Sequence, residues 1–446
     1  MSVAATVRQG LWWLALAGVL ALALVAGLID SAGALSRHIG AFQLFYGLGF
    51  AGYVWLVWSR AMARGGDHPQ EAVVLLTAAI VLRLVAFSGP SSEQLYRYVW
   101  EGRVQLEGWN PYSVAPNDDQ MAHLRDERWE AVVDRDATAT QAPLAEMLFA
   151  VVAWVYPACG SIKLALLGWE VVSLLALAGW ARAAGRSAAW VVVYGLSPLT
   201  VVAFAMEGHT DGLMLAWVAL AGWASLRRRW YACGVCVGLA VLSKAIALVL
   251  LVWLLIRNPR SALMALAVIL IGYLPYSAAG PGLLGSFAAY TSGPLFNSLV
   301  PQCLESVMST WSAGALCLIF FGSYVLWLAT CRQLEMHEFG LRAFGVMLIV
   351  LPAVHYSYVS WVLLFAVLDL RWRWVVLSGA MVFYFEVWGV HGRTGMYQMP
   401  AISEFLIWVP LVVAWVAEEA WRAWAIRDDR RRMAMHIMGC ERYHDV

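Results

Sequence analysis

Two short stretches of this chain concentrate residue types that could do chemistry. The first is SSEQLYRYVWEGR, residues 91–103, where Glu93, Arg97 and Glu101 recur at a spacing of four. A solvated helix with a ladder of ion pairs gives the same pattern, and each such pair contributes about 0.2–0.5 kcal/mol. A carboxylate held at a helix start, beside arginines at a membrane boundary, also suits a general base that faces an anionic phosphate.

The second stretch is EGHTD, residues 207–211, between apolar runs at 188–205 and 212–226. A solvent-exposed turn in which Asp211 caps the following helix explains this run without any catalytic role. In a functional interpretation, His209 and Asp211 hold acceptor hydroxyls or share proton transfer.

Four ionisable residues interrupt apolar runs: Arg83, Glu170, Lys244 and Glu386. Charges within lipid are costly, so they are usually paired or face water. We expect Arg83 and Glu170 to pair inside the bundle, whereas Glu386 has no partner that the sequence identifies. If its run is a broken hairpin, Lys244 points toward an outer cavity, where its compact charge could neutralise a phosphate.

The amino-acid composition indicates that transmembrane helices position these residues. Of 446 residues, 62% are hydrophobic and 13% are charged, whereas soluble domains carry about 25% charged residues. A net charge of +1 gives nucleic-acid binding no electrostatic support. We therefore predict an all-α polytopic membrane protein of about eleven to fourteen transmembrane helices.

Membrane spans need about 20 apolar residues. The longest candidate spans are 11–29, 41–58, 72–88, 161–181, 188–205, 231–256, 261–279, 312–331, 373–389 and 402–424. The shorter candidates, which we expect to be tilted, broken or paired, are 142–157, 212–226, 339–352 and 356–370.

The distribution of Lys and Arg predicts the orientation. Runs such as Arg227 to Arg229 mark the cytoplasmic side, and segment 89–141 then lies on the outer side. Arg182 and Arg186 should lie inside, which leaves an odd number of crossings for 142–181, so one of its two helices is expected not to cross fully. The predicted regions are N-terminal helices 1–88, an outer catalytic segment 89–141, a bundle 142–424 with a second outer loop 280–310, and a basic cytoplasmic tail 425–446.

Segment 89–141 shows two helical patterns, 91–106 and 118–133, separated by the turn signal Gly-Trp-Asn-Pro at 108–111. The first pattern carries several aromatic residues. Such an amphipathic helix would lie flat at the membrane interface, with its rings at headgroup depth.

At these residues the chain resembles bacterial polyprenyl-phosphate-mannose-dependent mannosyltransferases of the GT-C class. The likeness rests on SEQLYRYVWEGR (92–103), GWNPY (108–112) and AP (115–116), and it continues downstream in EGHTD, LSKAIALVLL and LPAVHYSYVSWVLL. Where members of that family carry an Asp pair, this chain has Glu93 and Gln94. Where they read Tyr-Pro-Pro-Leu-Ala, it has Gln141 followed by Ala-Pro-Leu-Ala.

The resemblance implies an inverting transfer of mannose from a polyprenyl-phosphate donor to a lipid, glycan or protein acceptor. The reaction is expected at the outer face of the cell (inner) membrane, among membrane lipids. The implied catalytic residues are Glu93, His209 and Asp211. The implied phosphate-binding residues are Arg97, Arg103 and Lys244, and the implied substrate-binding residues are Tyr96, Trp100, Asn110, Tyr112, Glu207, His355 and Tyr358. No cofactor is expected, and a divalent metal stays open, although Gln94 cannot supply a second carboxylate.

Other classes of function fit some of these observations. A transporter or flippase of a lipid-linked sugar would also carry intramembrane charges, but the sequence shows no inverted internal repeat of the kind common in transporters. A non-catalytic protein that binds the lipid donor is a third alternative, because Gln94 replaces a titratable residue. His355 with its flanking tyrosines fits an interfacial aromatic belt as well as a substrate site.

Overall fold

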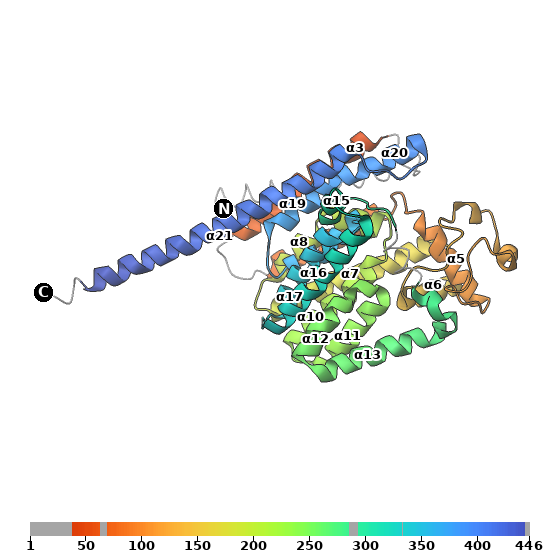
Figure 1. Ribbon diagram of the computed structural model, residues 1–446, viewed down its shortest axis with the longest axis horizontal. Helices are drawn as coiled ribbons and strands as arrows, with labels where there is room; N and C mark the ends of the chain where they lie inside the picture. The colour runs from red at the N-terminus through yellow and green to blue at the C-terminus, as the bar shows by residue number, and fades with distance from the viewer. Residues whose placement is uncertain (1–37, 63–68, 285–292, 332, 442–446) are drawn as a thin grey trace.

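A computed structural model describes residues 38–62, 69–284, 293–331 and 333–441, and helices dominate it (Figure 1). The main helices are α3 Ile39–Met62, α4 Pro69–Ala86, α5 Gln94–Leu106, α6 Pro143–Val155, α7 Cys159–Ala183, α8 Val192–Gly195, α9 Pro198–Thr200, α10 Asp211–Leu226, α11 Trp230–Ser243, α12 Leu248–Arg257, α13 Pro259–Tyr273, α15 Val300–Glu305, α16 Thr310–Cys331, α17 Met336–Val350, α18 Val359–Ala366, α19 Trp372–Ala380, α20 Glu386–Thr394 and α21 Ala401–Glu441. The 3₁₀ and π-helical segments are η1 Asp119–Leu124, η2 Trp129–Ala131, η3 Ala188–Val191, η4 Val201–Met206, η5 Ala245–Ala247, η6 Leu274–Leu284, η7 Tyr356–Tyr358 and η8 Met381–Phe385. No β-strand forms in these ranges, so the predicted all-α class is confirmed.

Seven of the described helical segments are long and apolar enough to cross a membrane, and an eighth is counted if the bent pair Ala188–Gly195 and Pro198–Met206 is one span. Further predicted spans correspond to shorter apolar helices, such as α10. The predicted span at 11–29 lies outside the described residues. The chain is therefore a multi-pass membrane protein, and the larger count of eleven to fourteen helices stays a prediction.

Glycines allow the two central helices, α7 and α10, to pack closely. A Cβ atom on Gly222 of α10 would lie 2.2 Å from the Trp180 ring of α7, and one on Gly179 would lie 2.9 Å from the Trp223 ring. Each glycine thus makes room for an indole of the other helix. This packing fixes the C-terminal ends of α7 and α10, which lead to Arg186 and Arg227, relative to each other.

A buried ion pair holds the bent span in place. Arg83 of α4 and Glu170 of α7 are fully buried, 3.0 Å apart, which confirms the predicted pairing. Arg83 also donates to the carbonyl of Gly195 at 2.6 Å, and Glu170 accepts the Tyr194 hydroxyl at 2.6 Å. These bonds hold the chain just before it bends by 64°. After the bend, the π-helical turn η4 leads directly to Glu207.

Lys244 lies where the apolar run 231–256 breaks. Helix α11 ends at Ser243 and α12 begins at Leu248. The rings of Trp230 and Trp253 lie 6.4 Å apart, so the two helices fold back on each other as a hairpin. The predicted broken hairpin is confirmed, with Lys244 at its tip.

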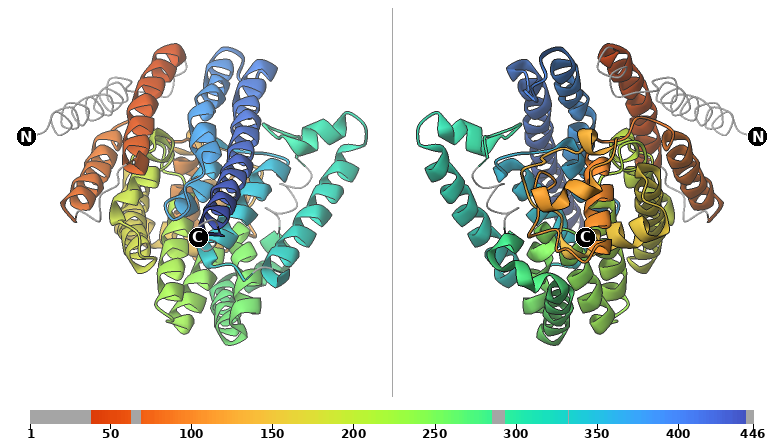
Figure 2. Two further views of the ribbon diagram at one scale, coloured as in Figure 1. Left: turned by 90° about the vertical axis from the view of Figure 1, so that its left-hand side faces the viewer. Right: turned by 90° about the vertical axis from the view of Figure 1, so that its right-hand side faces the viewer.

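The outer segment packs around α5 and α6, which lie together at one end of the bundle (Figures 1 and 2). Contrary to the predicted interfacial orientation, the rings of Tyr98 and Trp100 are only 3% and 2% exposed. Tyr98 stacks on Phe149 of α6 at 4.4 Å. An amphipathic aromatic helix can cover a protein core as well as lipid, and α6 supplies that core.

The predicted helix at 118–133 is wrong, because the segment forms two short turns, η1 and η2. Side chains there bond to loop backbone instead of supporting one continuous helix. Arg125 donates to the carbonyls of Asn117 and Asp118, and Trp129 donates to the carbonyl of Pro116.

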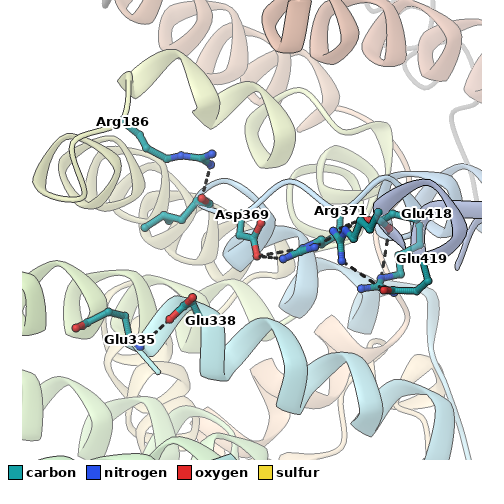
Figure 3. A network of polar contacts seen from close by, with 10 residues as sticks. Arg186, Glu335, Glu338, Asp369, Arg371, Glu418 and Glu419 are labelled. Carbon is teal, nitrogen blue, oxygen red and sulfur yellow. Dashed lines mark hydrogen bonds and ion pairs between the residues drawn. The ribbon is translucent and has the colours of Figure 1, made fainter. Parts of the chain in front are cut away.

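Helix α6 is too short to cross the membrane, which accounts for the odd number of crossings expected for 142–181. Its 13 residues reach about 20 Å, short of the roughly 30 Å hydrocarbon core. The 25 residues of α7 are long enough, and α7 runs from the outer segment to Arg186. Near Arg186, Arg371 pairs with Asp369 and Glu418, and Arg373 pairs with Glu418 and Glu419, which forms an ionic network (Figure 3). Charges that the sequence placed inside therefore share one end of the bundle.

Candidate active site

The start of the outer segment is tied to the second polar stretch. The backbone N–H of Ser92 donates to the carbonyl of Glu207 at 3.1 Å. Glu93 precedes α5 as its N-cap residue, but its side chain accepts no capping hydrogen bond. Its exposed carboxylate instead accepts the Tyr397 hydroxyl at 3.1 Å. The predicted position of Glu93 at a helix start is thus correct, whereas the partner of its carboxylate comes from a distant segment.

The run at 207–211 is a tight, mostly buried turn. Glu207 Oε2 lies 2.7 Å from His209 Nε2, so the carboxylate and the imidazole form a pair. Gly208 has a φ of +78°, a left-handed conformation that glycine adopts without steric cost. Thr210 donates to Gln141 Oε1 at 3.0 Å, which ties this turn to the end of the outer segment.

Asp211, Lys244 and Trp361 meet at one carboxylate oxygen. Asp211 is 2% exposed, and its Oδ1 accepts Lys244 Nζ at 2.8 Å and Trp361 Nε1 at 2.6 Å. The Lys244 ammonium also lies 4.8 Å from the centre of the Tyr358 ring. About a quarter of the lysine side chain stays exposed, at 26%. Lys244 is therefore a positioned cation that still has access to a ligand.

His355 lies against the His209 imidazole, with ring centres 4.7 Å apart. Its Nδ1 accepts the backbone N–H of Ser357 at 3.3 Å, which leaves the proton of a neutral ring on Nε2. Burial lowers the pKa of His355 well below its usual value, and the nearby His209 and Lys244 lower this pKa further. His355 is thus a neutral hydrogen-bond donor beside the Glu207–His209 pair.

The second outer loop fixes the chain just before His355. Phe296 exchanges backbone hydrogen bonds of 3.0 Å with Pro352 and Val354. Asn297 adds a side-chain bond to the carbonyl of Val354 at 3.0 Å. The described part of this loop therefore borders the site.

The sequence analysis missed Lys163, which lies near the outer start of α7. Lys163 is 2% exposed, and its Nζ donates to the carbonyl of Gly89 at 2.9 Å. It is also close enough to Glu207 for that carboxylate to act on it electrostatically. The sequence could have indicated Lys163, because a lysine two residues inside the predicted span 161–181 needs a polar partner.

The two arginines expected at the phosphate are engaged elsewhere in the outer segment. Arg97 lies 2.6 Å from Glu101, with both side chains buried, and it also donates to the carbonyls of Asp134 and Ala137. Burial raises the pKa of Glu101. Arg103 pairs with Asp126 at 2.7 Å. These contacts stabilise the fold of the segment and leave Lys244 as the better-placed candidate for the phosphate.

The aromatic and amide residues expected to bind substrate also contact protein. Trp100 lies in a buried cluster that Tyr96 borders. Asn110 donates to the carbonyl of Tyr276, and the Tyr112 hydroxyl donates to that of Gln141. Their contacts are those of residues that shape the outer segment.

Segments far apart in sequence thus bring carboxylates, imidazoles and lysines to one end of the bundle. Within the described ranges, no three His, Cys, Asp or Glu side chains are grouped to hold a metal. The arrangement combines an accessible carboxylate at Glu93 with a buried acid–imidazole pair and a cation at Lys244. It can accept a proton and stabilise an anion in the same region.

Comparison with known proteins supplies a family. The family model described as "Alpha-(1->6)-mannopyranosyltransferase, N-terminal domain" matches residues 5–258, more than half of the 446 residues. No curated protein matches the chain. The matched range includes Glu93, the 207–211 turn and Lys244, but ends before His355, Trp361 and Tyr397.

Proposed function

Because the chain belongs to the alpha-(1->6)-mannopyranosyltransferase family, we propose that it transfers mannose from a polyprenyl-phosphate donor to an acceptor hydroxyl. The reaction takes place at the outer face of the cell membrane, the side opposite to the Arg-rich loops. One observation supports this proposal most strongly: Ser92 bonds to Glu207, which brings the accessible Glu93 carboxylate to the turn that carries His209 and Asp211.

In the proposed reaction, Glu93 takes the proton of the acceptor hydroxyl. The acceptor oxygen then attacks the anomeric carbon from the face opposite to the phosphate. The bond between the anomeric carbon and the phosphate oxygen breaks with its electron pair, and polyprenyl phosphate leaves. Attack from the opposite face inverts the anomeric centre.

Lys244 is the residue that we assign to the leaving phosphate. Its position is set by Asp211 and by the rings of Tyr358 and Trp361, so little reorganisation is needed when negative charge develops. The neutral His355 can donate Nε2–H to the sugar or phosphate, and the Glu207–His209 pair holds the neighbouring imidazole.

The test is Glu93→Gln in purified protein supplied with radiolabelled polyprenyl phosphate mannose and a set of acceptors. We expect transfer to fall by about 10²–10⁴-fold, since loss of general-base catalysis has effects of that size. Glu107→Gln is the matched control, because Glu107 is an exposed acid one turn beyond Arg103. Unchanged transfer by Glu93→Gln would remove Glu93 from the mechanism.

The same preparation separates the alternative functions. Product formed in detergent, without a gradient, supports a transferase. Movement of the donor across vesicles without product would support a flippase, and tight donor binding without turnover would support a non-catalytic binder.

A further inference from the structure

Tyr397 lies in the loop between α20 and α21, 304 residues from Glu93 in sequence, and its hydroxyl donates to Glu93 Oε2 at 3.1 Å. Within the described part of the chain, this is the one side-chain hydrogen bond that the Glu93 carboxylate makes. Tyr397 also lies beyond residues 5–258, so the family match assigns it no role.

The loop around Tyr397 is built to hold its ring in place. The ring stacks on the His391 imidazole with centres 3.9 Å apart and planes 10° apart. Gly395 ends α20 with a φ of +71°, and its N–H donates to the carbonyl of His391 at 2.7 Å. Met396 N–H donates to Thr394 Oγ1 at 3.2 Å. The hydroxyl therefore approaches Glu93 from a fixed platform.

A phenol that donates to one carboxylate oxygen does two things to a general base. It stabilises the ionised form, and it leaves the other oxygen to face the acceptor. Burial raises the pKa of Tyr397, and the acidic groups Glu93, Glu207 and Asp134 raise it further. The phenol thus keeps its proton and stays a donor.

We infer that Tyr397 is a positioning residue that orients the Glu93 carboxylate for proton transfer. This inference rests on the proposed function, in which Glu93 is the base. The C-terminal half of the chain would then complete a site whose base comes from the N-terminal half.

The test is Tyr397→Phe, which removes the hydroxyl and keeps the ring on His391. We expect kcat to fall about tenfold with little change in the KM for the polyprenyl phosphate mannose donor. A loss confined to kcat separates misorientation of the Glu93 carboxylate from weaker donor binding. Tyr156→Phe, at a 64% exposed tyrosine, is the matched control.

Tyr397→Ala is expected to lower kcat by at least as much. A loss of kcat with Ala but none with Phe would assign the effect to the ring and overturn the hydrogen-bond role. If Glu93→Gln is inactive while Tyr397→Phe keeps the wild-type kcat, the role of Tyr397 is rejected and the base assignment stands. If Glu93→Gln stays active, the proposed base itself fails.

Discussion

Trp361 donates its indole N–H to Asp211 Oδ1 at 2.6 Å, although 150 residues separate the two in the chain. Lys244 donates to the same oxygen at 2.8 Å. A buried carboxylate is costly unless it is paired and hydrogen-bonded, so these two donors make a buried Asp211 tolerable. The first turns of α10 and α18 and the tip of the α11–α12 hairpin are therefore joined at one atom.

Lys244→Met should lower kcat/KM for the lipid donor by about a hundredfold, because the developing phosphate charge loses its cation. The measurement is the initial rate of mannose transfer as a function of donor concentration. Arg103→Met is the control, since Arg103 pairs with Asp126 at the surface of the outer segment. Equal donor kinetics in the two variants would contradict the phosphate role of Lys244.

Arg83→Met should cost about 3–5 kcal/mol of folding free energy, because it leaves Glu170 charged and buried without its partner. The double variant Arg83→Met/Glu170→Met should be less destabilised than the single variant. Unfolding in detergent checks the order. The half-exposed pair Arg257–Glu335 is the control: Arg257→Met should cost at most about 1 kcal/mol, and an equal loss in both arginine variants would count against the buried pair.

Gly222→Ala should destabilise the protein by about 1–3 kcal/mol, because its Cβ would lie 2.2 Å from the Trp180 ring. Gly168→Ala on α7 is the matched control, since nothing lies within 4 Å of its Cβ position. There the alanine should be neutral or stabilising by up to about 1 kcal/mol. Thermal unfolding of both variants in one detergent distinguishes the two outcomes, and equal melting temperatures would show that α7 and α10 can separate.

Stability should fall as the pH drops below about 6.5, the ordinary value for histidine. The pKa of His355 is lowered in the folded protein. As the pH falls, His355 therefore becomes protonated in the unfolded chain before it does in the folded protein, and this protonation favours the unfolded state. The loss begins near 6.5 and ends once the pH is below the folded pKa. Melting temperatures between pH 7.5 and 5 should show a weaker dependence for His355→Gln, whereas His123→Gln, at an exposed imidazole, should behave like the wild type.

The sequence predicts the features that follow from the high free-energy cost of a charge inside the membrane. Arg83 and Glu170 each lie in an apolar run, so their pairing followed from the cost of a lone charge. The break at Lys244 followed in the same way. The sequence identified no partner for Glu386. In the structure, its carboxylate accepts a hydrogen bond from Gln43 Nε2 at 3.1 Å. Glutamine is uncharged, so the distribution of charges along the sequence could not indicate it as the partner.

Other features depend on how distant segments pack. The direction of the Tyr98 ring could not be predicted, because a lipid surface and the face of α6 select the same apolar pattern. The contact between Tyr397 and Glu93 joins segments that no local periodicity relates. The roles of Glu93, His209 and Lys244 stay predictions, which the variants described above test.

The π-helical turn η4, Val201–Met206, has a consequence for how the chain tolerates change in length. An α-helical residue advances the chain by about 100° around the axis, and a π-turn holds an additional residue. Deletion of one residue of η4 is expected to restore α-helical winding and to rotate the whole 207–211 turn relative to His355. All six side chains of η4 are buried, so their packing holds the turn in place, and the number of its residues sets the direction in which the Glu207–Asp211 turn faces.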